Sequence, residues 1–445
     1  MAYQMIEIFL TAYDRSDLPG SSIDPLGFER GYLLLADKIL PGLTNAASHP
    51  RYFALICAGI DLSGDTVDPN RRELVRKHRQ ETILRLERFW GLANVLARPD
   101  NSGGVRGVTY AQAWAEELLR SGATRTTAKY PLLSRQSQYG AIGMYANVAS
   151  GMRFLNREDF TLTPALGEIA AEAFQDETKL PPTLRRAILD DGDVSLATLK
   201  AWGEQAHVEA EVKIGEARCL FDAQHSNPIR SRTTGLLRRH PRKNDQETEL
   251  SRLARVVQFL RGTSQNQDLR EAIECILEFE SCYQIVTLAM ERLLWLCRHH
   301  AAAAVTFREL NSDPILATVM KEIPTRTERF LNTINNGTEA AFRHDLDRLS
   351  DVRRFLEDAS IACGNAREFI EVVINRHTDI QRGKFDRGRR KMPWLECDDT
   401  RINLTMTRAG GRNSETTLPE QIEPHPYRVQ AADALSFASA KAAQL

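Results

Sequence analysis

Residues 207–213, HVEAEVK, combine a histidine, two carboxylates and a lysine, which are residue types that hydrolytic enzymes use. A Glu-x-Lys pair such as Glu211 and Lys213 serves a nuclease when it lies on a strand facing a second carboxylate, because the carboxylates must bind one Mg²⁺ and its attacking water. Three further carboxylates precede the segment, at Asp190, Asp191 and Asp193. The surrounding sequence has helical composition, so we expect Glu209 and Lys213 to form a surface pair four residues apart on a helix. A Mg²⁺-dependent nuclease therefore stays only as an alternative.

Two runs rich in arginine offer a different chemistry, the neutralisation of phosphate groups. The first run lies in a Pro-bounded connector, residues 227–244, which we expect to be flexible. It contains Arg230, Arg232, Arg238, Arg239, Arg242 and Lys243. The second run, RGKFDRGRRK, contains Arg382, Lys384, Arg387, Arg389, Arg390 and Lys391. Phe385 and the nearby Trp394 could stack on bases. We predict that at least one run binds DNA or RNA, the alternative being that both are solvated linkers.

Other patterns that carry chemistry are absent or weak. The chain has no Gly-rich phosphate loop, no GxSxG elbow and no HExxH zinc helix. His299 and His300 are adjacent, and adjacent helical residues point about 100° apart, so we expect a helix C-terminus rather than a shared site. Seven cysteines without CxxC spacing indicate buried thiols rather than disulfides or zinc ligands. We therefore expect no catalytic residue, no metal ligand and no cofactor.

A short hairpin is predicted within residues 149–174. Its strands are expected at Met152–Leu155 and Phe160–Thr163, joined by a polar turn at residues 156–159. A helix is expected to follow from Pro164 to about Phe174. A Gly-interrupted helix or helix pair, residues 130–151, is expected before the hairpin.

This stretch resembles the strand, turn, strand and LT-P-x-x-G-x-x-x-A close of bacterial winged-helix domains. The matching positions are Leu162, Thr163, Pro164, Gly167 and Ala171. The resemblance implies that residues 134–150 would enter a major groove. That helix offers Arg135, Gln136, Gln138, Tyr139 and Asn147 but is otherwise mostly Gly, Ala and Met. Because a recognition helix presents several phosphate- and base-contacting side chains, we expect the wing-like fold to serve packing or partner contact rather than DNA reading.

The composition is that of a globular protein. Of 445 residues, 42% are hydrophobic and 26% are charged, which argues against disorder and against a membrane-embedded chain. The apolar stretch near the amino terminus is broken by Glu7 and followed by Asp14, so it lacks the pattern of a secretory signal and we expect a cytoplasmic protein. The formal net charge is −1, so any attraction to nucleic acid must be local.

Helical periodicity dominates the chain. Helices are expected to begin at Asp24-Pro25 and at Asp68-Pro69, and further helices are expected within residues 109–122, 247–279, 282–307, 314–335 and 338–377. Ile402, Leu404 and Met406 alternate with polar residues as in a short strand. The final residues, 409–445, are expected to be partly disordered, with a short terminal helix.

We therefore predict a mainly α, multi-helix protein of two to three domains, with a small winged-helix-like β-hairpin and a short C-terminal strand region. The expected limits are 1–100 for an N-terminal helical domain, 109–222 for a winged-helix-like domain, 245–380 for a C-terminal helical domain and 381–445 for the basic segment, short strand and tail.

Two stretches, DPLGFERGYLLLADKILPGLTN and RHTDIQRGKFDRGRRKMPWLE, resemble bacterial proteins encoded beside helicases and nucleases in mobile-element and antiviral-defence loci. The resemblance implies membership of a multi-protein system and assigns no functional residue. We predict a non-catalytic, nucleic-acid-associated subunit with protein partners. The alternatives are a helical scaffold or adaptor that binds only protein, and the Mg²⁺-dependent nuclease.

Overall fold

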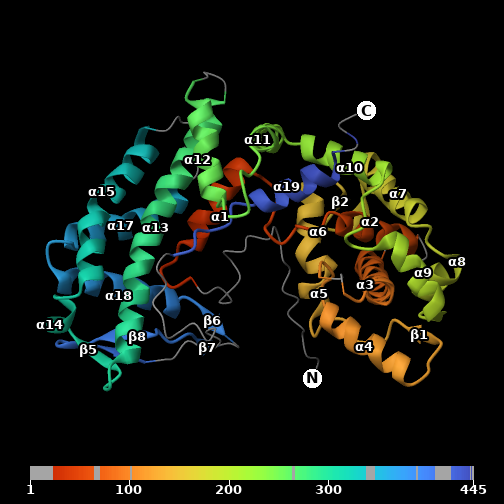
Figure 1. The fold of residues 1–445 in the computed structure, drawn as a ribbon, viewed down its shortest axis with the longest axis horizontal. Coiled ribbons are helices and arrows are strands. Elements are labelled where there is room, and N and C mark those ends of the chain that lie inside the picture. Colours follow the sequence, from red (N-terminus) through yellow and green to blue (C-terminus); the bar gives the residue numbers. More distant parts are fainter. Residues whose placement is uncertain are drawn as a thin grey trace. The chain divides into compact units, whose positions relative to one another are not determined.

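The structure is a computed structural model that describes residues 24–64, 71–100, 103–262, 266–336, 346–386, 389–405, 422–440 and 442. Over these residues the chain is mainly helical, as predicted, with a few short antiparallel strands (Figure 1). It divides into two compact units. The described residues of Met1–Ile39 and Arg242–His425 form unit 1, and those of Leu40–Pro241 and Pro426–Leu445 form unit 2. The chain therefore passes between the units three times.

Unit 2 is built around α2 (Arg51–Ser63) and α3 (Arg72–Ala97). Every residue of α2 except Asp61 is buried, in agreement with its apolar sequence. The periodic apolar residues of α3, among them Phe89 and Trp90, are also buried. The two helices approach closely at Gly59, where an added Cβ would lie 2.8 Å from Cγ1 of Ile83. A larger residue at this position would force the helices apart.

The remaining elements of unit 2 surround this pair. They are α4 (Val108–Arg120), β1 (Arg125–Thr127), α5 (Gln136–Tyr139), α6 (Ala141–Gly151), β2 (Leu155–Asn156), β3 (Thr161–Leu162), the π-helix η2 (Pro164–Glu168), α7 (Ile169–Glu177), α8 (Pro182–Leu189), β4 (Asp193–Ser195), α9 (Leu196–Ala206), α10 (Ile214–His225), α11 (Pro228–Arg239) and α19 (Val429–Ala438). Strand β1 pairs antiparallel with β4. The predicted terminal helix is α19, and Nε2 of Gln224 donates to its Ala432 carbonyl at 3.3 Å.

Unit 1 is a helical bundle with a small sheet. Its helices are α1 (Glu29–Ile39), α12 (Glu249–Leu260), α13 (Gln267–His299), α14 (Phe307–Leu310), α15 (Pro314–Asn336), α17 (Leu346–Ala362) and α18 (Ala366–Arg382). The long helix α13 packs against α1, α12 and α15. The sheet has the order β5–β9–β8, formed by β5 (Ala304–Thr306), β9 (Arg401–Leu404) and β8 (Leu395–Cys397), all antiparallel. A separate hairpin joins β6 (Phe385–Asp386) to β7 (Arg389–Arg390).

Several predicted elements need correction. Helix α1 begins at Glu29 rather than at Pro25, because the Asp24 carboxylate accepts the N–H groups of Gly27 and Glu29, both at 2.8 Å, in a turn before the helix. The connector 227–244, expected to be flexible, contains the helix α11. The predicted segment 338–377 holds two helices, α17 and α18, and Asn365 caps the second. The predicted helix start at Asp68-Pro69 and the strand residue Met406 lie outside the described residues.

The predicted domain limits follow the order of the sequence, whereas each unit joins distant segments. Residues 109–222 lie in unit 2 together with most of the predicted N-terminal domain. Residues 245–380 lie in unit 1 together with α1. The passage from Pro241 to Arg242 falls within the connector that was predicted to be a boundary. Among the described helices, none has both the length and the apolar character needed to span a bilayer.

Candidate functional site

The late basic run is folded as the hairpin of β6 and β7, which sits in unit 1 at the same end as the three-stranded sheet (Figure 1). Phe385 lies directly opposite Arg390 across the two strands. The ladder extends by one further bond, in which the Lys391 N–H donates to the Lys384 carbonyl at 2.9 Å. The described part of this run is therefore ordered backbone rather than an unstructured linker.

Three side chains in the described part of this run face solvent. Arg382 is exposed at the last position of α18, and Arg390 is exposed on β7. The Phe385 side chain is 42% exposed, and the Arg390 guanidinium carbon lies 6.0 Å from the centre of its ring. Arg387 and the side chain of Arg389 lie outside the described residues. We call Phe385 and Arg390, which pair across the two strands, together with Arg382 at the end of the preceding helix, the hairpin surface.

Two other cations of the same run, and the tryptophan beside it, are used for packing. Nζ of Lys384 donates to the Asp24 carbonyl at 2.5 Å, and burial lowers the pKa of Lys384. Lys391 is only partly exposed. The Trp394 ring packs on His377, with 5.0 Å between ring centres. Lys384 thus anchors the hairpin to Asp24, and Trp394, which contacts His377, stays partly exposed.

The first basic run divides in a similar way along α11. Arg230 is buried, and its Nη groups donate to the carbonyls of Pro41 at 2.8 Å and Ala223 at 2.6 Å. Burial lowers the pKa of Arg230 to about 10. Arg232 is partly exposed. Four cations of the run, Arg238, Arg239, Arg242 and Lys243, are exposed.

Some exposed arginines elsewhere in the described chain form an ion pair with a carboxylate, whereas others, such as Arg135 and Arg185, form none with a carboxylate of the described residues. Arg120 pairs with Glu117 at 2.6 Å, and Arg125 pairs with Asp193 at 2.8 Å. In the two runs, five exposed arginines also form no ion pair with a carboxylate of the described residues: Arg238, Arg239, Arg242, Arg382 and Arg390.

The hairpin of β2 and β3 resembled a wing in sequence, and it is docked against α3. Its strands pair as predicted but are only two residues long, with Leu155 opposite Leu162. Phe160, which begins the second predicted strand, is buried. Nη1 of Arg79, on α3, donates to the Asp159 carbonyl in the turn at 3.1 Å. These contacts use the hairpin for packing inside unit 2.

The helix that would enter a major groove is α6, together with the short α5 before it. No side chain between Ala141 and Ser150 is exposed, and Asn147 is only partly accessible. Gln136 is buried, where its Nε2 donates to the Glu87 carboxylate at 2.7 Å and its Oε1 accepts from Nε of Arg88 at 2.7 Å. Helix α6 therefore presents no fully exposed side chain, whereas Arg135, Gln138 and Tyr139, in and just before α5, are exposed.

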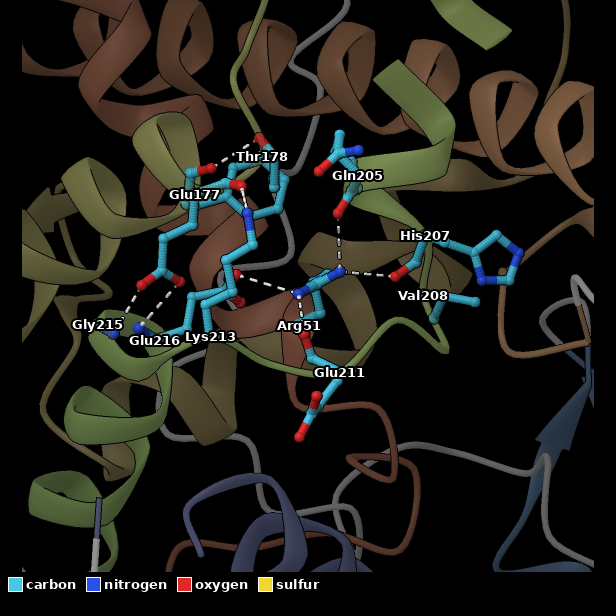
Figure 2. A network of polar contacts seen from close by, with 12 residues as sticks. Arg51, Glu177, Thr178, Gln205, His207, Val208, Glu211, Lys213, Gly215 and Glu216 are labelled. Carbon is cyan, nitrogen blue, oxygen red and sulfur yellow. Dashed lines mark hydrogen bonds and ion pairs between the residues drawn. The ribbon is translucent and has the colours of Figure 1, made fainter. Parts of the chain in front are cut away.

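Residues 207–213 form a loop between α9 and α10, so the prediction of a helical pair at Glu209 and Lys213 was wrong. Oε1 of Glu209 instead lies 3.6 Å from Nδ1 of His49. Nζ of Lys213 donates to the Glu177 carbonyl at the end of α7. In return, Oε1 of Glu177 accepts the Gly215 N–H at 2.7 Å, which caps the start of α10 (Figure 2).

The loop is held by the buried side chain of Arg51. Nη1 of Arg51 donates to the His207 carbonyl at 2.7 Å, and Nη2 lies 3.4 Å from the Glu211 carbonyl and 3.3 Å from Oε1 of Glu216 (Figure 2). Burial raises the pKa of Glu216, and the Arg51 charge opposes this shift. Glu211 contributes its backbone to this network, while its carboxylate points away from Arg51.

The carboxylates before the loop are used in ion pairs at other places. Asp193 pairs with Arg125, and Asp191 lies 3.2 Å from Nζ of Lys129. Within the described ranges, no group of three or more His, Cys, Asp or Glu side chains could hold a metal ion. Residues 207–213 and these aspartates therefore do not converge on one Mg²⁺ position, and the geometry gives the nuclease alternative no support.

His299 and the cysteines, the remaining candidates from the sequence, are used in helix ends and in packing. Helix α13 ends at His299, as predicted, and Nδ1 of His299 lies 2.8 Å from the Trp295 carbonyl. All seven cysteines are free thiols. Five of them are buried, at Cys57, Cys219, Cys275, Cys282 and Cys297, and Cys363 and Cys397 are partly exposed. Burial raises the pKa of the Cys363 thiol to about 11, which disfavours the reactive thiolate.

The comparisons with known proteins add no relative. No protein-family model, no curated protein and no solved structure matches the chain. The candidate site therefore rests on the geometry of the chain itself.

Sequence reasoning missed that the late basic run is a hairpin. A usable signal was present, because Arg387 and Gly388 separate the residues of β6 from those of β7. A two-residue connection that contains glycine is typical of a tight β-hairpin.

Proposed function

We propose that this protein is a non-catalytic, nucleic-acid-associated subunit of a bacterial multi-protein system. The observation that carries the proposal is the hairpin surface, on which the exposed Arg390 lies beside the exposed ring of Phe385, with a further exposed arginine, Arg382, three residues before Phe385 in the chain. Phosphate groups of DNA or RNA are the anions that such a surface suits, because guanidinium groups bind phosphate oxygens in a planar, two-point manner.

Because the whole protein carries almost no net charge, the proposed binding must come from local groups of cations. With a formal net charge of −1, the protein as a whole does not attract a polyanion. Binding then depends on Arg382, Arg390 and the second exposed group, Arg238, Arg239, Arg242 and Lys243. Each phosphate that an arginine neutralises releases condensed counterions, so affinity falls as salt rises.

The proposal is tested by measuring the affinity of fluorescently labelled DNA and RNA for three forms of the full chain at low salt. The forms are the wild type, Arg382→Gln/Arg390→Gln and the matched control Arg120→Gln/Arg125→Gln. The control removes the same charge from exposed arginines that already pair with Glu117 and Asp193. We expect only the first variant to bind more weakly. Absence of binding by the wild type contradicts the function, and equal loss in both variants contradicts the site.

The cellular setting follows from the sequence resemblance alone. We place the protein in the cytoplasm, beside helicases or nucleases of a mobile-element or antiviral-defence locus, where it would contact other subunits. The genes on either side of its own gene test this part directly.

A protein-only scaffold is the second candidate, and two exposed apolar side chains favour it. Phe437 on α19 is 85% exposed and Ile361 on α17 is 82% exposed, and each is a separate apolar side chain that a protein partner would bury. This candidate predicts that the wild type and both arginine variants bind labelled nucleic acid equally poorly.

A further inference from the structure

We propose that the hairpin surface binds nucleic acid as a single strand, with a base stacked on the ring of Phe385. This inference rests on the proposed function and adds the kind of nucleic acid and the contact that selects it.

The register of the hairpin separates its two faces. Side chains alternate between the faces of a strand, and residues directly opposite in an antiparallel pair share a face. Phe385 and Arg390 are opposite and therefore lie on one face. Their neighbours Lys384 and Lys391 lie on the other face, where Lys384 is anchored to the Asp24 carbonyl. One face thus fixes the hairpin to unit 1, and the other presents the ring and the guanidinium.

The ring of Phe385 differs from other exposed rings of the described chain. Tyr110, Tyr139, Phe259 and Phe437 are also exposed. The Arg390 guanidinium lies over the ring of Phe385, whereas no guanidinium group of the described residues lies over the rings of Tyr110, Tyr139 and Phe437. Several phenylalanines of unit 1, such as Phe279 and Phe369, are instead fully buried in its bundle. An aromatic face beside a cation is the arrangement on which bases stack.

The chemistry of the ring favours a single strand over a duplex. A duplex shows its base edges in the grooves, and these edges are read by hydrogen-bonding groups, which phenylalanine lacks. The base faces are covered by neighbouring base pairs in a duplex and are free in a single strand. Arg390, which lies beside the ring, can hold a phosphate next to a stacked base without reading its identity, and Arg382 adds a second exposed charge. We therefore expect little sequence preference.

The test measures binding of four full-chain proteins to three labelled probes. The proteins are the wild type, Phe385→Leu, Phe385→Trp and Phe437→Leu, the last being a matched control at an exposed ring without a guanidinium. The probes are an oligothymidylate, a duplex and an abasic strand with the same number of phosphates as the oligothymidylate. Circular dichroism of each variant reports whether it is folded.

We expect Phe385→Leu to weaken binding of the oligothymidylate by about 5- to 100-fold, the usual effect of removing one stacking ring. Phe385→Trp and Phe437→Leu should bind like the wild type. The salt dependence should be unchanged in Phe385→Leu, because no charge is lost. The abasic strand should bind weakly to the wild type and be insensitive to Phe385→Leu.

Two results would overturn the inference while leaving the proposed function intact: salt-dependent binding that Phe385→Leu does not weaken, or a duplex bound at least as tightly as the single strand. If the wild type binds none of the probes, the proposed function itself fails, and this inference fails with it.

Discussion

Glu87 holds the amino terminus of α6: one oxygen of its buried carboxylate accepts the N–H of Ala141, the first residue of that helix, at 2.7 Å. The other oxygen accepts from Nε2 of Gln136, also at 2.7 Å. Burial raises the pKa of Glu87 to about 7, although the hydrogen bonds from Gln136 and Ala141 favour the charged form. This carboxyl group joins α3 to the two helices that precede the wing-like hairpin.

The raised pKa predicts how stability changes with pH. Because the pKa of Glu87 is higher in the folded chain than its usual value of 4.5, the folded state binds more protons between pH 4.5 and about pH 7. The contribution of Glu87 is therefore full below pH 4.5 and is lost as the pH rises to about 7. The loss is of the order of 3 kcal/mol. Relative to the wild type, Glu87→Gln should gain stability from pH 5 to pH 8 in urea unfolding, and parallel pH profiles would contradict this assignment.

His377, in unit 1, should show the opposite dependence. Its Nδ1 lies 3.1 Å from the Pro25 carbonyl and must donate to it, and its Nε2 accepts the Trp394 N–H at 2.9 Å. This neutral ring is buried, and burial lowers its pKa from 6.5 to about 4. Stability is therefore full above pH 6.5 and is lost as the pH falls to about 4, again by roughly 3 kcal/mol. His377→Gln can keep both hydrogen bonds without titrating.

The measurement for His377 is the difference in unfolding free energy between His377→Gln and the wild type at several pH values. The variant should gain on the wild type as the pH falls from 6.5 to 4. If the difference stays constant over this range, the imidazole does not titrate as the buried geometry requires.

The buried pair of Arg51 and Glu216 predicts a non-additive effect of mutations. Arg51→Met leaves a buried carboxyl group without its cation and several carbonyls without a donor, so we expect a loss of about 3–5 kcal/mol. Arg51→Met/Glu216→Leu removes both charges and should be more stable than Arg51→Met alone. Thermal unfolding is measured for these two variants and for the single variant Glu216→Leu. A double variant whose loss equals the sum of the two single losses would show that the pair is not coupled.

Gly167 tests the packing of the wing-like hairpin. An added Cβ would lie 2.0 Å from the Phe154 carbonyl oxygen, so Gly167→Ala must displace backbone and should destabilise the protein by more than about 1 kcal/mol. Gly235 in α11 is the matched control, because nothing lies within 4 Å of the added Cβ. Gly235→Ala should stabilise the protein by up to about 1 kcal/mol. Equal melting temperatures for the two variants would contradict the close packing at Gly167.

The helical framework was predictable because apolar periodicity reflects burial in a local segment. The spacing of Phe89 and Trp90 in α3 and the continuous apolar run of α2 correctly indicated buried helices. The start of α1 was misjudged by one turn. Asp24 caps a preceding turn rather than the helix, and only the three-dimensional positions of Gly27 and Glu29 show this.

Errors arose where distant residues decide the conformation. Residues 207–213 have helical composition, but their carbonyls at His207 and Glu211 bind Arg51, more than 150 positions earlier. Arg230 looked like part of a solvated linker, yet the Pro41 carbonyl from another part of the chain gives it a buried partner. Such contacts outweigh local propensity, and no pattern within either segment indicates them.

The central claim, that Arg382 and Arg390 bind phosphate groups, is tested most directly by the salt dependence of binding. The affinity of the wild type and of Arg382→Gln/Arg390→Gln for a labelled oligothymidylate should be measured between about 50 and 200 mM salt. We predict that the logarithm of the binding constant falls linearly with that of the salt concentration, and that the slope is smaller by about 1.4 in the variant. An unchanged slope would contradict the account.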